Sequence, residues 1–574
     1  MPPTQIKGAS ILATNLIKSY CLKEQFKDAR RLFDEIPERD VVAWTSMISG
    51  YTSGGRNTQA WTMFCDMKKE DVQLNAFTVS SVLKACKGMG VVSCGSMVHG
   101  LAVKNGVDGN MYVQNALMDM YATCSAGMSE ACMVFEMISV KNDVSWTTMI
   151  ASYTHKGDGY AALKVFKRMV QEEAELNSYT YSITIRACAS IGSYTYGQQI
   201  HAAVGKHGFG SDPPVGNSLV DMYCRCGKVS EAYRYFHEMP ERDLITWNTM
   251  ISGFERSGSD GSLQLFSQLS SEVLHPNCFT FTSVVASCAN LAVLHCGRQI
   301  HAVIVRRGLD GNVALANAFI DMYAKCGSIA DSRRIFDEMP SRDVISWTSI
   351  MNGYGSHGYA DEAIRLFGEM VHCGVKPDQL VFMGLISACS HSGLVDDGLK
   401  YFHFMWNNYN IKPNQEIYGC VVDLLGRAGR VTEAYELTVT MPFEPDKLVW
   451  GALLGACKAH RNSYIGRLAA NKILDLRPNG AETYVMLSNI YASDGRWGEF
   501  AEMRKLMRGT CSKKVAGRSW IEVRNQVYNF VVGEKLGPNI ELVYEELETL
   551  IQHMKEVGYV PDLECCIEDF EAVA

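Results

Sequence analysis

The sequence predicts an all-α fold in which helical hairpins stack into a superhelix with a long concave groove. Four tryptophans are separated by 102, 101 and 100 residues, and each lies in a near copy of one segment: Trp44, Trp146, Trp247 and Trp347. Two further sets repeat with the same period: Cys86, Cys188, Cys288 and Cys389, and Tyr121, Tyr223 and Tyr323. Such a period indicates a repeat array, and it overrides the roughly four ordinary domains suggested by 574 residues.

Each block of about 101 residues divides into three helical hairpins. In the third that runs from 344 to 378, apolar residues occur at three-to-four spacing on both sides of the breaker His-Gly-Tyr. These residues are Ile345, Ile350, Met351, Tyr354, Ala363, Leu366, Phe367 and Met370. Because neither helix can bury its apolar stripe alone, neighbouring hairpins must stack.

One block splits into thirds of 34, 35 and 31 residues, at 244–277, 278–312 and 313–343. Tetratricopeptide and ankyrin arrays lack this long, long, short rhythm. The segments WTSMISGY, FTFTSVVASCANLAVLHCGRQIHAVIVRRG and ANAFIDMYAKCGSIADSRRIFDEMPSRD resemble, in turn, the P, L and S repeats of plant organellar pentatricopeptide repeat proteins of the PLS class. The resemblance covers residues 11 to about 562 and implies a right-handed superhelical solenoid of antiparallel helix-turn-helix repeats.

The same resemblance implies the order of domains. A short N-terminal segment (1–10) precedes thirteen repeats in P-L-S triplets (11–446). The next region (447–514), with DKLVWGALLGACKAH and ETYVMLSNIYASDGRW, resembles the E1 and E2 motifs, which are tetratricopeptide-like helix pairs. Residues 515–574 resemble the E+ extension, with SWIEVRNQVYNFVVGEK, a helix around Glu541 to Lys555 and GYVPD. The extension departs from the family pattern at VAGRSW and GEKLGP.

Composition limits the partners. No stretch reaches the 18 or more uninterrupted apolar residues of a membrane span, so no membrane partner is expected. The net charge of −8 and the pI of about 6.0 argue against non-specific binding of polyanions, which depends on Lys and Arg. The 20 cysteines recur singly, which indicates small buried hydrophobic residues kept reduced.

The sequence predicts no enzyme, metal site or cofactor. Longer relatives continue from GYVPD into a cytidine-deaminase-like (DYW) domain, whose zinc chemistry needs His-x-Glu and Cys-x-x-Cys. Neither motif occurs here, and Cys224 with Cys226 and Cys565 with Cys566 have the wrong spacing. Three recurring histidines, His99, His201 and His301, occur once per block, so they cannot converge on one ion, and core packing is the favoured interpretation.

Two positions per repeat vary only among hydroxyl, amide and carboxylate side chains. The first position lies near the start of the first helix: Thr45, Thr147, Asn248 and Thr348 in P repeats, and Asn15, Asn115, Asn217 and Asn317 in S repeats. The second is the last residue of the repeat: Asn75, Asn177, Asn277 and Asp378 in P repeats, and Asp40, Asn142, Asp243 and Asp343 in S repeats. From the pattern alone, helix capping is the favoured role of the last residue. The family resemblance implies instead that these pairs read one RNA base per repeat.

Hydrogen-bond chemistry converts these pairs into a base preference. Asp only accepts and suits the N–H of uracil or guanine, whereas Asn suits adenine or cytosine, and a short Thr leaves room for a purine. The predicted element is U-A-n-Y-A-n-U-Y-n-U-G-n-n, where n marks L repeats and the closing unit. Its fourth base is open because either Asn142 or Asp143 could be the reader. Apolar residues two places before each Trp are expected to sandwich the bases, with a core role equally compatible: Val42, Val144, Ile245 and Ile345.

The resemblance implies a factor that binds single-stranded organellar RNA, selects cytidines for C-to-U editing and recruits a DYW-type deaminase in trans. Organellar editing cofactors are further expected partners. Two alternatives stay open, a factor for organellar splicing or transcript stability and a peptide-binding scaffold. The first ten residues, MPPTQIKGAS, show no evident targeting peptide, so either the true start is absent or the address lies elsewhere. The mitochondrion is ranked before the chloroplast.

Overall fold

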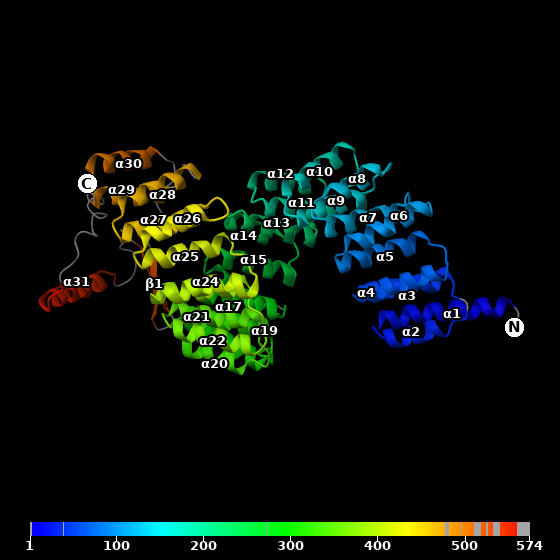
Figure 1. Ribbon diagram of the computed structural model, residues 1–574, viewed down its shortest axis with the longest axis horizontal. Coiled ribbons are helices and arrows are strands. Elements are labelled where there is room, and N and C mark those ends of the chain that lie inside the picture. The colour runs from blue at the N-terminus through cyan, green and yellow to red at the C-terminus, as the bar shows by residue number, and fades with distance from the viewer. Residues whose placement is uncertain are drawn as a thin grey trace. The chain divides into compact units, whose positions relative to one another are not determined.

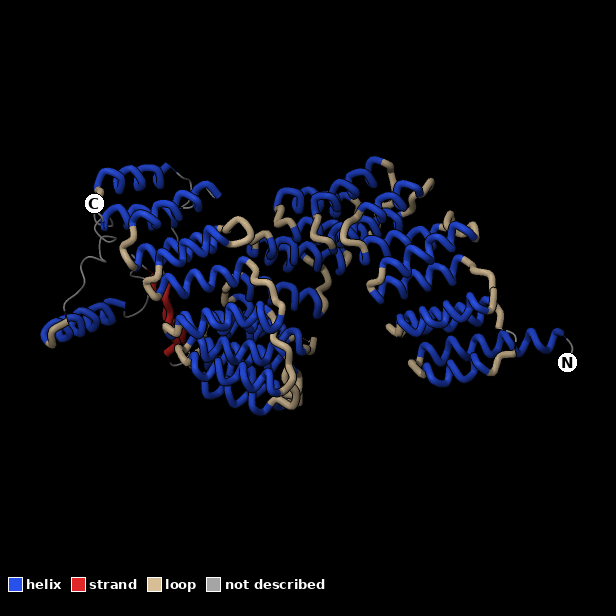
Figure 2. The backbone as a smooth tube through the Cα atoms, in the orientation of Figure 1, coloured by secondary structure: helices blue, strands red, loops and turns tan. Residues whose placement is uncertain are grey.

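The computed structural model describes residues 3–37, 39–272, 274–476, 481–493, 495–509, 518–523, 526–531 and 540–559. Nearly all of them are helical, which confirms the all-α class (Figure 1, Figure 2). The chain forms two compact units. The first comprises residues 1–257 and 261–275, and the second comprises 258–260 and 276–574.

In the described residues of the first unit there are sixteen α-helices and one short 3-10 helix, and the first and second helices of the hairpins alternate along the chain. They are α1 (Pro3–Leu22), α2 (Phe26–Asp34), α3 (Val41–Ser53), α4 (Asn57–Lys69), α5 (Ala76–Met89), α6 (Val92–Lys104), α7 (Met111–Cys124), α8 (Ser129–Met137), α9 (Asp143–His155), α10 (Gly159–Gln171), α11 (Ser178–Ser190), α12 (Tyr194–Lys206), η1 (Phe209–Ser211), α13 (Pro213–Arg225), α14 (Val229–Glu238), α15 (Leu244–Arg256) and α16 (Gly261–Ser271).

The second unit continues the alternation and ends with a short hairpin of strands and one more helix. Its elements are α17 (Cys278–Asn290), α18 (Leu294–Arg306), α19 (Val313–Lys325), α20 (Ile329–Glu338), α21 (Val344–Ser356), α22 (Ala360–His372), α23 (Gln379–Ser392), α24 (Val395–Tyr409), α25 (Gln415–Arg427), α26 (Val431–Thr440), α27 (Lys447–Ala459), α28 (Ser463–Leu476), α29 (Ala481–Ser493), α30 (Trp497–Gly509), β1 (Arg518–Val523), β2 (Gln526–Val531) and α31 (Ile540–Glu556).

Each unit is built in two layers. In the first unit, the first helices α1, α3, α5, α7, α9, α11, α13 and α15 each contact the next one in the series. In the second unit, α17, α19, α21, α23, α25, α27 and α29 do the same. The second helices pack against the first helices of their own and the following hairpin, for example α4 against α3 and α5. Within each unit, the first helices therefore form one row of neighbouring helices. The division into thirteen repeats with their predicted bounds stays a prediction.

One hairpin shows why the chain folds this way. Helix α21 begins directly after Asp343, whose side chain accepts a hydrogen bond from the Ser346 N–H, and ends at Ser356. Gly358 then takes φ +78°, a left-handed conformation that costs glycine little, and α22 begins at Ala360. The two helices predicted for residues 344–378 are confirmed.

The recurring aromatic residues are buried in the hydrophobic core. The four tryptophans that mark the blocks are at most 5% exposed. Each meets the edge of a phenylalanine from the preceding hairpin, with ring centroids 4.8 to 5.0 Å apart: Phe33 with Trp44, Phe135 with Trp146, Phe236 with Trp247 and Phe336 with Trp347. Edge-to-face pairs of this kind stabilise a core beyond simple burial. The recurring Cys86, Cys188, Cys288 and Cys389 are buried, as predicted.

The recurring histidines serve the same packing. Each ring accepts or donates a hydrogen bond at Nδ1 to the hydroxyl of a tyrosine 22 residues later, at 3.0 Å for His99 with Tyr121, 2.7 Å for His201 with Tyr223 and 2.9 Å for His301 with Tyr323. Burial lowers the pKa of His201 and His301. The structure therefore confirms a structural role for these residues.

The C-terminal region departs from the purely helical pattern. Strands β1 and β2 pair antiparallel, with Arg518 opposite Val531 and Val523 opposite Gln526. No strands were predicted for this segment, although the alternation in WIEV and QVYNFV is typical of strands. Helix α31 confirms the helix predicted around Glu541 to Lys555. Within the described ranges, no helix combines the length and the apolarity that a membrane crossing needs.

Candidate nucleic-acid interface

The last residue of each predicted P and S repeat caps the next first helix. In all eight cases its side-chain Oδ1 accepts a hydrogen bond from the backbone N–H three residues later, over 2.8 to 3.1 Å. The caps are Asp40, Asn75, Asn142, Asn177, Asp243, Asn277, Asp343 and Asp378. The capping role favoured from pattern alone is thus real.

Capping also fixes what these side chains offer to a ligand. In each case Oδ1 is the atom that caps the helix. The other terminal atom of the side chain is Nδ2 in Asn, which is a hydrogen-bond donor, and Oδ2 in Asp, which is an acceptor. The Asn and Asp caps are therefore opposite in hydrogen-bond polarity while they perform the same local task. Asn142 caps α9 as the other last residues do, and Asp143 is the first residue of the helix. Asn142 is therefore the structural equivalent of the other last residues, and its role as reader of the fourth base stays a prediction.

The second predicted position lies at the fifth residue after the capping residue. The Thr hydroxyls at this position donate to a carbonyl one turn earlier, from Thr45 to Val41 O at 2.6 Å, from Thr147 to Asp143 O at 2.8 Å and from Thr348 to Val344 O at 2.8 Å. The Asn amides reach the last residue of their own repeat. Nδ2 of Asn217 lies 3.4 Å from Oδ1 of Asp243, and Nδ2 of Asn317 lies 3.2 Å from Oδ1 of Asp343. The structure brings these two pairs of predicted readers into direct contact.

The fifth residues are more buried than side chains that line an open channel would be. Thr147, Asn248 and Asn317 are only 5%, 7% and 8% exposed, respectively. Four others are half-buried: Thr45, Asn115, Asn217 and Thr348. By contrast, five last residues are exposed, namely Asp40, Asp243, Asn277, Asp343 and Asp378, and the remaining Asn75, Asn142 and Asn177 are half-buried. The last residues, which lie at helix ends, are therefore more accessible than the fifth residues.

Two of the covered amides keep an unused acceptor. The Oδ1 atoms of Asn217 and Asn317 are buried without a hydrogen-bond partner. An unsatisfied buried carbonyl costs on the order of 1–3 kcal/mol, which a donor inserted beside it would recover.

A row of buried hydroxyls links the two reading positions, and the sequence analysis missed it. These hydroxyls belong to the third residue after the capping residue. Ser145 Oγ lies 2.9 Å from Asn115 Oδ1 and 2.8 Å from Asn142 Oδ1. Ser346 Oγ donates to Asp343 Oδ1 over 2.8 Å. The row comprises Thr78, Ser145, Thr180, Thr246, Thr280 and Ser346, all fully buried. Its sequence signal is a Ser or Thr that recurs three places after each of these caps.

The first predicted reader, Asn15, has different surroundings from its neighbour. Asn15 is exposed, whereas Thr14 is 5% exposed. Asn217 precedes Asp243 by 26 residues and Asn317 precedes Asp343 by 26, and Thr14 stands at the same spacing before Asp40. Spacing and burial therefore favour Thr14 as the equivalent of Asn217 and Asn317, and the role of Asn15 stays a prediction.

Hydrogen bonds set the charge of the Asp readers. Partial burial raises the pKa of Asp243, but donation from the Thr246 N–H, the Thr246 hydroxyl and the Asn217 amide outweighs it and lowers the pKa below its usual value. The pKa of Asp343 is lowered in the same way, against the effect of burial, by Ser346 and Asn317. Both carboxyls are therefore ionised and act only as acceptors at neutral pH.

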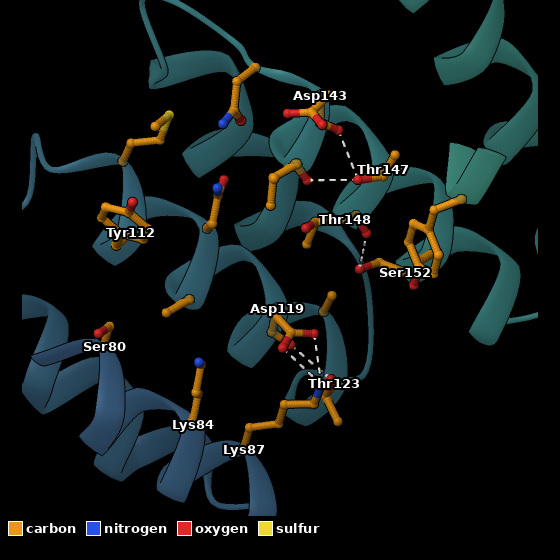
Figure 3. Close-up of a pocket in the computed structure, with 18 of the residues that line it drawn as sticks. Ser80, Lys84, Lys87, Tyr112, Asp119, Thr123, Asp143, Thr147, Thr148 and Ser152 are labelled. Atoms are coloured by element: carbon orange, nitrogen blue, oxygen red, sulfur yellow. Dashed lines mark hydrogen bonds and ion pairs between the residues drawn. The ribbon is translucent and has the colours of Figure 1, made fainter. Parts of the chain in front are cut away.

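One cavity in the first unit gathers several predicted readers. Its volume is about 1010 Å³, and it is lined by side chains from α5, α7, α9 and α11 (Figure 3). Four predicted readers line it, namely Asn115, Asn142, Thr147 and Asn177. Its basic groups include Lys84, which is exposed, and Lys87, whose Nζ lies 2.8 Å from Asp119 Oδ2. The cavity therefore combines hydrogen-bonding groups with side chains of both charges, because Asp119 and Asp143 also line it.

The predicted base-sandwiching residues lie at the surface. Exposed fractions are 48% for Val42, 47% for Val144, 63% for Ile245 and 60% for Ile345. Val144 lines the cavity beside Thr147. The alternative core role is wrong for these four residues. Among the residues that the structure describes, no group of His, Cys, Asp or Glu could hold a metal ion.

Comparison with known proteins identifies the repeats and the C-terminal motif. The pentatricopeptide repeat family matches residues 39–88, 141–190 and 342–391, with further single-repeat matches at 12–41, 217–244, 245–259, 315–344 and 381–409. The E motif family matches residues 460–522. The residues of this chain therefore comprise repeats and an E motif, neither of which is catalytic.

Similar proteins span nearly the whole chain. A putative pentatricopeptide repeat-containing protein of Arabidopsis thaliana is 55% identical over 99% of this chain and 94% of its own length. A chloroplastic and a mitochondrial pentatricopeptide repeat-containing protein of Arabidopsis thaliana are 38% and 34% identical over 96% and 95% of this chain, and the chain spans 68% and 63% of their lengths. The crystal structure of a maize pentatricopeptide repeat protein matches the fold with a TM-score of 0.53 at 16% identity, over 87% of this chain and 79% of that one.

Proposed function

The chain belongs to the pentatricopeptide repeat family, in its PLS class with an E motif, and on this premise we propose that it binds single-stranded RNA in a sequence-specific way. The observation that carries the proposal is the double use of the last residue of each repeat. One terminal atom caps a helix, and the other is a donor in Asn75 or an acceptor in Asp343 at a fixed place. In Asn177 this donor already reaches Asp143 Oδ2 over 3.1 Å. A row of such atoms matches a row of bases.

Base preference follows from this polarity. The Nδ2 donor of an Asn cap complements adenine N1 or cytosine N3, which accept, and the Oδ2 acceptor of an Asp cap complements the N–H of uracil or guanine. The fifth residue selects the size of the base. The Thr hydroxyl donates its hydrogen to a carbonyl of its own helix, and the short side chain leaves space for a purine, whereas the longer Asn side chain fills that space. With Thr14 as the first reader, the proposed element becomes G-A-n-Y-A-n-U-Y-n-U-G-n-n.

We further propose that the bound RNA carries a cytidine for organellar C-to-U editing, 3′ of the last repeat. The support is the E motif match together with helices α27 to α31, which follow the repeats and extend beyond the readers. These helices and the adjoining strands would recruit a DYW-type deaminase in trans, with organellar editing cofactors as further partners. The proposed location is the mitochondrion, with the chloroplast second, and a fluorescent fusion in plant cells distinguishes the two.

Transcript sequencing tests the editing role. Plants that lack the protein should contain an organellar transcript with an unedited cytidine 3′ of the proposed element. Unspliced or missing transcripts with normal editing would instead establish the splicing or stability role and overturn this one. Complementation with the wild-type chain should restore editing at the same cytidine.

Direct binding tests the RNA role. In a gel shift, the purified protein should bind the proposed element more tightly than a scrambled RNA of the same composition. Thr348→Asn, with Asp378 unchanged, should shift preference at the eleventh base from G toward U. Equal affinity for both RNAs would favour a peptide-binding scaffold, and an unchanged eleventh base would reject Thr348 as a reader.

A further inference from the structure

The L repeats, which carry no assigned base, expose large apolar side chains at the same helical position as the residues expected to sandwich bases. That position is the second residue after the capping residue. Its occupants in the L repeats are 66% exposed for Phe77, 61% for Tyr179, 60% for Phe279 and 52% for Leu380. Three of the four are aromatic. Large exposed rings at one recurring place are informative, since burial is the usual fate of such side chains.

The helix start that carries each of these residues is capped in the same way as in the P repeats. Asn75, Asn177 and Asn277 cap α5, α11 and α17 through Oδ1, at 2.8, 2.9 and 3.0 Å from the N–H of the third helical residue. That third residue is a fully buried Thr in each case. The cap and the buried Thr fix the first turn, so the ring between them stands at a defined place on the exposed side of the helix.

The cavity of the first unit places one such ring beside predicted RNA-contacting residues. Tyr179 lines it together with Val144, the second residue of the preceding hairpin, and Tyr112, the second residue of the hairpin before that. Figure 3 shows Tyr112 at the same opening as Thr147 and Ser80. Second residues from three consecutive first helices, α7, α9 and α11, therefore line one space.

A second pair of aromatic rings has a separation close to the one required for a base to insert between them. The rings of Phe77 and Tyr112 are stacked with centroids 6.1 Å apart and an interplanar angle of 26°. A flat base in contact with both rings needs about 7 Å, twice the optimal carbon contact distance of about 3.5 Å. A displacement of roughly 1 Å between adjacent first helices would admit it.

We propose that the L repeats of this protein hold RNA bases by stacking on Phe77, Tyr179 and Phe279 without selecting their identity. Every base has a π face, so an aromatic ring grips any base, and the hydrogen-bonding pairs of P and S repeats supply selectivity. This inference rests on the proposed RNA binding and assigns the positions marked n a physical role. Leu380 offers no ring, so the L repeat of α23 grips its base more weakly than the other three.

The test uses the full chain and the proposed element with 2-aminopurine at the sixth nucleotide, which faces the repeat of Tyr179. Wild-type protein should quench its fluorescence, Tyr179→Phe should quench equally, and Tyr179→Ala should not. Tyr179→Ala should weaken binding by about tenfold, within the range of about 1–3 kcal/mol per stacked base. Tyr160→Ala is the matched control, because Tyr160 is 59% exposed on a second helix, α10, and it should change neither readout.

A gain-of-function variant strengthens the test. Leu380→Phe should increase quenching of 2-aminopurine at the twelfth nucleotide and raise affinity. Replacement of the sixth base by an abasic site should lower the RNA affinity of the wild type but not that of Tyr179→Ala. Exchange of that base for any other base should leave the affinity of both proteins unchanged. Unaltered quenching and affinity in Tyr179→Ala would overturn the stacking role, and the L-repeat rings would then be open to a protein partner. Loss of discrimination between the element and scrambled RNA in the wild type would instead overturn the proposed function.

Discussion

Two rows of apolar residues, two positions apart on the same helices, have opposite surroundings. The fourth residues after the caps, Trp44, Trp146, Trp247 and Trp347, are at most 5% exposed, whereas the second residues, Val42, Val144, Ile245 and Ile345, are at least 47% exposed. Both rows recur with the period of the repeat. Recurrence therefore marks packing and binding positions alike, and only the surroundings in three dimensions separate them.

The largest expected effect is on the buried row. Trp146→Ala removes a side chain that meets Phe135 edge to face at 5.0 Å and leaves a cavity between two hairpins. A loss of about 3–5 kcal/mol in the free energy of unfolding is expected. Chemical denaturation measures it, and a loss of less than about 1 kcal/mol would contradict the packing role.

The exposed row should respond in the opposite way. Val144→Ala removes two methyl carbons from the cavity wall, and about 0.8 kcal/mol for each buried carbon predicts roughly tenfold weaker RNA binding. The stability of the protein should change little, because Val144 is already 47% exposed. Fluorescence anisotropy with labelled RNA and a parallel unfolding curve separate the two quantities. Lower stability at unchanged affinity would place Val144 in the core.

Between the two rows lies the third residue, which is buried yet positioned to serve recognition. Ser346→Ala removes the hydroxyl that donates to Asp343 Oδ1 at 2.8 Å. One hydrogen bond of this kind stabilises by about 1 kcal/mol, and its loss should also relax the preference for uracil at the tenth nucleotide. Ser356→Ala, at the exposed end of the same helix, is the control. A change in stability alone would limit Ser346 to capping.

The histidine row should give the smallest effect, and only at acidic pH. Burial lowers the pKa of His201, so the unfolded chain, in which histidine titrates near 6.5, binds the proton more readily than the folded protein. Stability should therefore fall as pH decreases below about 6.5 toward the lower folded pKa. Thermal unfolding at pH 7.5 and 5.5 checks this, and His201→Gln should show a smaller difference between the two. An equal difference in both proteins would assign the pH effect to other groups.

The sequence predicted the repeats well because each hairpin depends on local signals. The apolar period, the capping residue and the glycine turn within residues 344–378 were enough to predict α21 and α22. The site was predicted less completely. The burial of Thr147 and Asn317 depends on how closely the next first helix packs, which no local pattern contains. The β1–β2 hairpin was missed because its family resemblance was followed instead of its alternation.

The central claim is that the atom left over by each cap reads the base. Asp343→Asn tests it most directly, because Asn caps a helix about as well as Asp and only the outer acceptor becomes a donor. Affinities for four RNAs that differ at the tenth nucleotide should change from a strong preference for uracil to similar affinities for cytosine and uracil, as for the other Asn–Asn pairs, with stability nearly unchanged. A preference for uracil over cytosine as strong as that of the wild type would contradict the account.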